Sequence, residues 1–155
     1  MVFSFFEPKA LKKSKRAAQA AGLQRQQASD KIAIEMQLVD KCRSLAFRSR
    51  DKLLAEPRDG NEALVQLLIS IRSADELIQA LERGLPHALK ALSQKHEAAV
   101  ASNSIAAYDE VQSAELEIRD SFLELHKQAL EVIEALLKAD AACESVLRES
   151  SVNVT

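Results

Sequence analysis

Three histidines are the first candidates for catalysis or metal binding, because histidine is the commonest acid–base and metal-ligating side chain. They are His87, His96 and His126. His96-Glu97 opens like the HExxH zinc motif, but Val100 stands where the second histidine is required. No glutamate lies three residues before any histidine, so the Glu-x-x-His pair of di-iron bundles is absent as well. We expect no catalytic residue, no metal site and no cofactor.

Glycine and cysteine chemistry is equally sparse. Three glycines are too few for a phosphate-binding loop or a nucleophile elbow. Cys42 and Cys143 are too few and too far apart for a disulfide framework or a zinc cluster. Both fall on apolar helix faces, where we expect them to pack as free thiols. Free thiols fit a reducing compartment, and we expect a cytoplasmic protein.

One polar set interrupts the apolar rows of the last helical segment. It includes Glu115, Arg119 and His126, with Gln112 and Asp140 nearby. Glu115 and Arg119 are four residues apart, which is the spacing of an intrahelical ion pair. We expect a buried polar layer that fixes helix register or oligomeric state. The alternative is a ligand site inside the bundle, which would make the chain a ligand-binding or enzymatic bundle.

The N-terminus combines bulky apolar residues with a basic cluster. The apolar group is Val2, Phe3, Phe5 and Phe6, and the basic group is Lys9, Lys12, Lys13, Lys15 and Arg16. This pattern is typical of an interfacial membrane anchor, in which phenylalanine enters the headgroup boundary and the cations meet anionic lipid. Two alternatives remain open: the phenylalanines staple the bundle end, or the basic first helix pairs with an acidic helix.

Charge is distributed unevenly along the chain. Residues 1–29 hold six basic residues against Glu7 alone, whereas residues 103–155 hold eleven acids against four bases. Nucleic acid is not an expected partner, because no aromatic residues interleave the basic ones and the chain is acidic overall. No run is long enough to span a membrane. Residues 1–29 also resemble an organellar transit peptide in composition, which leaves that form of targeting open.

The elements that position these residues are predicted to be long helices. Only three glycines and three prolines punctuate 155 residues, which argues against many short strands. Breaks are expected at residues 57–60 and at Ser102-Asn103-Ser104, a polar cluster suited to capping a new helix. We predict helices over residues 9–56, 61–102 and 104–148, preceded by an apolar segment at 1–8 and followed by a frayed tail at 149–155.

Apolar residues recur at helical spacing within each predicted segment. In the last one a seam recurs every seven residues, and a second row of leucines lies about 100° around the helix. The seam consists of Val111, Ile118, Leu125, Val132, Ala139 and Val146, and the second row of Leu116, Leu123, Leu130 and Leu137. We predict an all-α, single-domain, elongated antiparallel three-helix bundle with a kink at Pro86. The alternative is a compact four-helix bundle with breaks near Gly22 and Pro86.

Taken together, these features favour binding over catalysis. Wide apolar faces on long helices leave surface to bury, so we expect a homo-oligomer or a complex with another protein. The leading hypothesis is a non-enzymatic helical scaffold or adaptor that self-associates and docks on an anionic membrane surface through its apolar-basic N-terminus. The alternative is a soluble, chaperone-like or regulatory protein-binding module that uses the acidic last helix.

Overall fold

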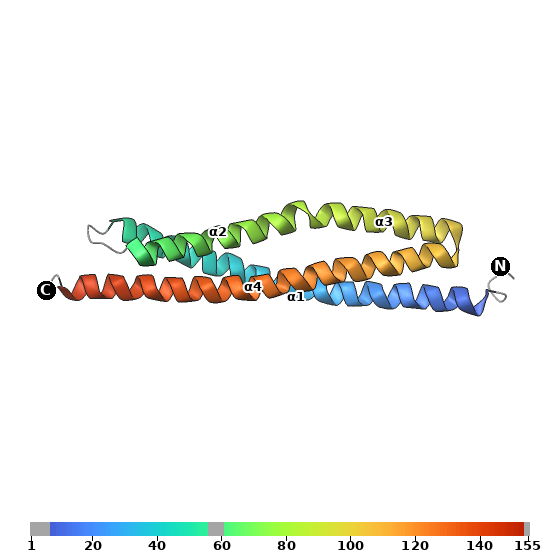
Figure 1. The fold of residues 1–155 in the computed structure, drawn as a ribbon, viewed down its shortest axis with the longest axis horizontal. Helices are drawn as coiled ribbons and strands as arrows, with labels where there is room; N and C mark the ends of the chain where they lie inside the picture. The colour runs from blue at the N-terminus through green and yellow to red at the C-terminus, as the bar shows by residue number, and fades with distance from the viewer. Residues whose placement is uncertain (1–6, 56–60, 154–155) are drawn as a thin grey trace. The chain divides into compact units, whose positions relative to one another are not determined.

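The computed structural model describes residues 7–55 and 61–153, and every regular element in these ranges is an α-helix. The helices are α1 (Lys9–Ala55), α2 (Asn61–Arg83), α3 (Leu85–Ser102) and α4 (Ile105–Asn153) (Figure 1). The all-α prediction is therefore confirmed. The apolar residues Phe3, Phe5 and Phe6 and the predicted break at residues 57–60 lie outside the described residues.

Helix α1 is continuous over its 47 residues, including Gly22 and Ser29. A lone glycine in a helix costs only about 1 kcal/mol relative to alanine, which tertiary packing readily offsets. The alternative four-helix arrangement, which required a break near Gly22, is therefore wrong. Helix α1 is described as far as Ala55, and its predicted end at residue 56 lies outside the described residues.

The predicted helix over residues 61–102 is interrupted for one residue, Gly84, so that it forms two helices rather than one kinked helix. Gly84 keeps right-handed helical torsions, φ −83° and ψ −47°. Pro86 follows in the first turn of α3, where its missing N–H costs little. The hydrogen-bond ladder resumes at once, because the Ala88 N–H donates to the Gly84 carbonyl at 3.2 Å. The proline therefore breaks the ladder without turning the chain out of helical conformation.

The connection between α3 and α4 is capped on both sides. Asn103 adopts left-handed torsions, φ 48° and ψ 43°, and its N–H donates to the Ala99 carbonyl at 2.8 Å. Ser104 then caps α4, since its hydroxyl accepts the Ala107 N–H at 3.2 Å. The capping role predicted for this polar cluster is confirmed. Helix α4 runs to Asn153, beyond the predicted end at Arg148, so residues 149–153 continue the helix.

The described residues group into two compact units. The single domain predicted over residues 9–148 stays a prediction. Unit 1 contains residues 7–32 of the N-terminal region, 81–102 with α3, and 103–124 at the start of α4. Unit 2 contains residues 33–55 of α1, 61–80 of α2 and 125–153 of α4. In each unit the middle segment runs antiparallel to the other two, so each is a three-helix packing (Figure 1).

Both units have cores built from alternating spacings of three and four residues. On α1 the buried apolar positions are mostly small: Leu11, Ala18, Ala21, Ala28 and Ile32 in unit 1, and Val39, Cys42, Ala46 and Leu53 in unit 2. The facing segments supply the larger side chains, including Leu92, Val111 and Phe122 in unit 1 and Leu67, Ile71 and Leu136 in unit 2. Small residues on one helix let the others approach closely, which positions the polar groups described next.

Candidate functional site

Glu115 lies at the centre of a polar cluster in unit 1. Only 1% of the residue is exposed, and it is among the largest fully buried side chains of the described structure. On α4 it falls in the same seven-residue row as Tyr108 and Phe122, which points it into the bundle. A buried carboxylate needs charged or hydrogen-bonding partners, because removing it from water is costly.

The partners of Glu115 come from the other two helical segments of the unit. The Arg25 guanidinium of α1 donates to one carboxylate oxygen in an ion pair. His96 of α3 places Nε2 2.7 Å from the other oxygen. Both partners reach solvent, with side chains 21% and 47% exposed respectively. The buried Glu115 of α4 thus contacts both α1 and α3, through partners that lie partly at the surface.

Gly22 makes room for this arrangement. A Cβ atom at position 22 would lie 3.3 Å from Glu115 Oε1 and 3.6 Å from Cδ. The first distance is tighter than ordinary van der Waals contact, so any larger residue would press on the carboxylate. In the sequence Gly22 mattered only as a helix break in the alternative four-helix arrangement, whereas the structure gives it a packing role.

The structure separates the three residues expected to form one polar layer. Glu115 has the partners given above, whereas Arg119 of α4 donates to Gln24 at 2.6 Å and to Asp120 at 2.8 and 3.0 Å. His126 belongs to unit 2, where its Nε2 lies 3.7 Å from Glu35 Oε1. Neither Arg25 nor His96 was predicted from the sequence as a partner of Glu115.

Unit 2 carries its own polar contacts between α1 and α4. The Ser49 hydroxyl, in a residue only 3% exposed, donates to Asp140 and lies 3.5 Å from Glu144. Lys52 Nζ is 3.9 Å from Glu144. Together with Arg25–Glu115 in unit 1, these contacts join α1 and α4 within the chain. None of them involves the basic cluster of residues 9–16, so the pairing of that cluster with an acidic helix stays a prediction.

The two cysteines are buried free thiols in unit 2. Burial raises the pKa of both thiols above the ordinary value of 9.0, and Asp140 raises the pKa of each further by its charge. For Cys42 the neighbouring Lys41 acts in the opposite direction. Cys143 donates to the Ala63 carbonyl at 3.5 Å. A raised pKa keeps the thiol protonated and weakly nucleophilic.

The basic residues of the N-terminal region divide by orientation. Lys9, Lys12, Lys13 and Arg16 are exposed, and their spacing of i, i+3, i+4 and i+7 places them on one face of α1. That face is opposite the side buried through Leu11, Ser14 and Ala18. Lys15 is instead paired with Glu7 and lies 5.5 Å from the centre of the Tyr108 ring. We call the four exposed residues the basic face.

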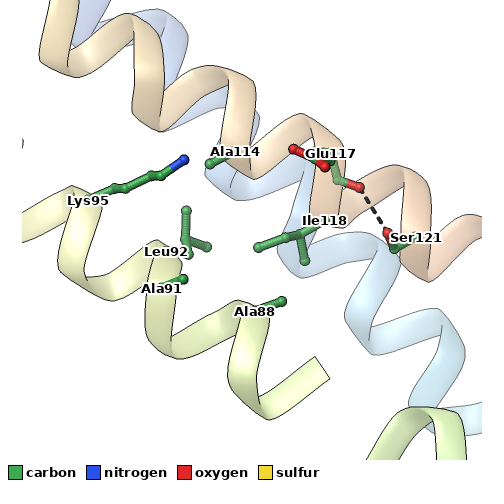
Figure 2. Close-up of a pocket in the computed structure, with 8 residues that line it drawn as sticks. All are labelled: Ala88, Ala91, Leu92, Lys95, Ala114, Glu117, Ile118 and Ser121. Atoms are coloured by element: carbon green, nitrogen blue, oxygen red, sulfur yellow. Dashed lines mark hydrogen bonds between the residues drawn. The ribbon is translucent and has the colours of Figure 1, made fainter. Parts of the chain in front are cut away.

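A cavity of about 200 Å³ lies between α3 and α4 in unit 1 (Figure 2). Leu92 and Ile118 project into it from the two helices, and alanines form much of the remaining wall. The Ser121 hydroxyl already donates to the Glu117 carbonyl of its own helix at 3.2 Å. Lys95 of α3 and Glu117 of α4 also line the cavity, which is smaller than the roughly 300–1,000 Å³ usual for a ligand pocket.

Within the part of the chain that the structure describes, no group of three or more metal-ligating side chains comes together. No helix in the same part is apolar and long enough to cross a membrane. No protein-family model, curated protein or solved structure matches this chain.

Proposed function

We propose that this chain is a non-enzymatic helical scaffold that docks on an anionic membrane surface through its N-terminal region. The observation that carries the proposal is the basic face, Lys9, Lys12, Lys13 and Arg16, on the solvent side of α1. Four cations on one helix face can approach a flat anionic surface together, because the opposite face of the helix is already occupied by packing.

Electrostatics alone makes this docking moderate and reversible. Each basic residue near an anionic membrane contributes about 1 kcal/mol, so four contribute about 4 kcal/mol, or roughly a thousandfold in partitioning. Stable attachment takes a second, apolar contribution. We assign that contribution to Phe3, Phe5 and Phe6, which precede the basic face in the sequence.

Vesicle flotation tests the proposal with a matched pair of variants. Serine substitution of Lys9, Lys12, Lys13 and Arg16 should reduce binding to vesicles containing phosphatidylserine by at least about 100-fold. The control replaces Lys31, Arg83, Lys90 and Lys95 by serine, which removes the same residue types from other exposed positions of unit 1. Binding should survive in the control and be absent from vesicles of neutral lipid.

Two results would refute membrane docking. The first is that the wild-type chain fails to float with anionic vesicles at low salt. The second is that both quadruple variants lose binding to the same extent. Binding would then depend on the net charge of the chain and not on the basic face. A Phe3/Phe5/Phe6→Ser variant should also bind weakly, and wild-type binding by this variant would remove the assigned apolar contribution.

A second candidate function, protein binding through the acidic helix α4, is favoured by its exposed carboxylates Asp109, Glu110 and Glu117 in unit 1. Such a surface suits a partner helix rich in lysine and arginine. Fluorescence anisotropy with a basic amphipathic peptide would test it. Neutralising the three acids should abolish binding, whereas serine substitution of the basic face should leave it unchanged; equal effects would argue against this function.

A further inference from the structure

Four leucines on the surface of unit 2 follow a regular pattern. Leu38 and Leu45 of α1 are seven residues apart, as are Leu130 and Leu137 of α4. Their exposed fractions are 43%, 40%, 47% and 51%. Single exposed leucines are ordinary, but two aligned rows on neighbouring helices gather apolar surface, and gathered apolar surface usually marks an interaction site.

The register between α1 and α4 places the two rows side by side. Ser49 contacts Asp140 across a separation of 91 residues, and Glu35 contacts His126 across the same separation. Lys52 contacts Glu144, which lies 92 residues later. Residues seven apart share a helix face, so the Lys52–Glu144 contact places Leu45 level with Leu137, and Leu38 level with Leu130, on neighbouring faces of the two helices. We call this surface the leucine groove.

The two sides of the leucine groove carry different charges at its midpoint. On α1 the exposed Lys41 lies between the levels of Leu38 and Leu45, on the solvent side. On α4 the exposed Glu131 and Glu134 lie between the levels of Leu130 and Leu137. Lys127 and Lys138 flank these acids further along α4. At its midpoint the groove is therefore basic on the α1 side and acidic on the α4 side.

We propose that the leucine groove binds a second copy of this chain, with helices parallel and a two-fold axis along them. In that arrangement α1 of each copy faces α4 of the other, and Lys41 lies near the partner's Glu131 and the partner's Glu134. An antiparallel two-fold would instead set Lys41 against the partner's Lys41. The charge pattern selects the parallel form, since like charges opposed in an interface are unfavourable.

The size of the surface suits such a dimer. The leucines span eight residues of each helix, or roughly 12 Å, and an interface centred on them can extend over the neighbouring turns of α1 and α4 in unit 2. Eighteen residues of two adjacent helices measure roughly 27 Å by 20 Å, an outline that side chains corrugate. Its accessible area is therefore of the order of the 800 Å² that each partner contributes to a standard interface. This inference does not rest on membrane docking, because the basic face lies in unit 1 and the leucine groove lies in unit 2.

Sedimentation equilibrium of the full chain tests the surface. The wild-type chain should be a dimer at micromolar concentration, and Leu130→Glu/Leu137→Glu should weaken dimerisation by at least about 100-fold. The control, Leu54→Glu/Ile69→Glu, alters two exposed apolar residues of unit 2 outside the groove, with exposures of 63% and 53%. It should remain dimeric. A monomeric wild type, or a dimer that survives the groove substitutions, would overturn the proposal.

Charge reversal tests the arrangement with less risk to folding, because it changes only exposed residues. Lys41→Glu should weaken the dimer by about tenfold, and adding Glu134→Lys should restore most of the affinity. Circular dichroism should report unchanged helix content for both variants. If Lys41→Glu strengthens association, the antiparallel arrangement is correct and the proposed parallel dimer is wrong.

Discussion

At the scale of single residues, Glu115 shows how the bundle tolerates a buried acid. Its carboxylate leaves solvent, but Arg25 and His96 each bind one oxygen while keeping part of their own side chains in water. The desolvation free energy is therefore spent mainly on the Glu115 carboxylate, because the side chains of Arg25 and His96 stay partly in water. A buried acid with two surface-reaching partners also favours one register among three helices, since a slip of any one separates the charges.

Removing the carboxylate should therefore destabilise the fold. We expect Glu115→Ala to lower the free energy of unfolding by about 2–3 kcal/mol, less than the loss of a wholly buried pair because Arg25 and His96 can hydrate. Urea denaturation measures the change. The exposed Glu110 on the same helix is the control, and Glu110→Ala should stay within about 0.5 kcal/mol of wild type. If the free energy of unfolding fell equally in both variants, the contacts of Glu115 with Arg25 and His96 would not be what stabilises the fold.

The buried thiols should make stability depend on alkaline pH. Because burial raises the pKa of Cys42 and Cys143 in the folded chain, unfolded thiols ionise at lower pH than folded ones. Stability from this source is complete below pH 9.0 and is lost as the pH rises above it. The free energy of unfolding should fall less between pH 8 and about pH 10 in a Cys42→Ala/Cys143→Ala variant than in wild type. An identical fall in the two proteins would contradict this.

At the scale of helices, two connections with opposite torsions invite opposite substitutions. Gly84 has right-handed torsions, so Gly84→Ala should stabilise the chain by about 0.5–1 kcal/mol through reduced freedom of the unfolded state.

Asn103 has φ 48°, so Asn103→Ala should destabilise the chain by about 1 kcal/mol, whereas Asn103→Gly should not. Thermal unfolding of the three variants checks both signs. A stabilising Asn103→Ala would mean that the left-handed cap is unimportant.

Local sequence signals predicted helices better than they predicted contacts. The starts of α1 and α2 and the Ser104 cap follow from nearby residues, and Glu115 lies in a recognisable apolar row. Its partners were not predictable in the same way, because Arg25 is 90 residues away and the contact depends on the register between helices. The rule of four-residue spacing suggested Arg119, but that rule describes only neighbours on one helix. The chemistry of Pro86 was recognised, yet the interruption itself falls at Gly84.

At the scale of the whole molecule, α1 and α4 each contribute to both compact units without a break. A helix cannot unfold in one unit without leaving unsatisfied backbone groups at the start of the other. We therefore expect the two units to unfold together in a single transition.

The chain contains natural probes for this expectation. Tyr108, the single tyrosine, reports on unit 1 by its fluorescence, and the thiols of Cys42 and Cys143 report on unit 2 by their reactivity. The urea transitions from the two probes should coincide in wild type. Glu115→Ala, although confined to unit 1, should shift both by the same amount. Separate transitions would show that the units unfold independently.

The missing Cβ at Gly22 has a consequence for how this sequence can change over time. While Glu115 is present, a larger residue at position 22 must displace an oxygen 3.3 Å away. Once the acid is lost, that obstacle disappears and alanine becomes the better helix former. The effect of a substitution at position 22 thus depends on the residue at position 115. The order in which the two positions mutate therefore decides which substitutions selection accepts. In a library randomised at both sites and selected for folding, glycine should be enriched at 22 chiefly in clones that retain glutamate at 115.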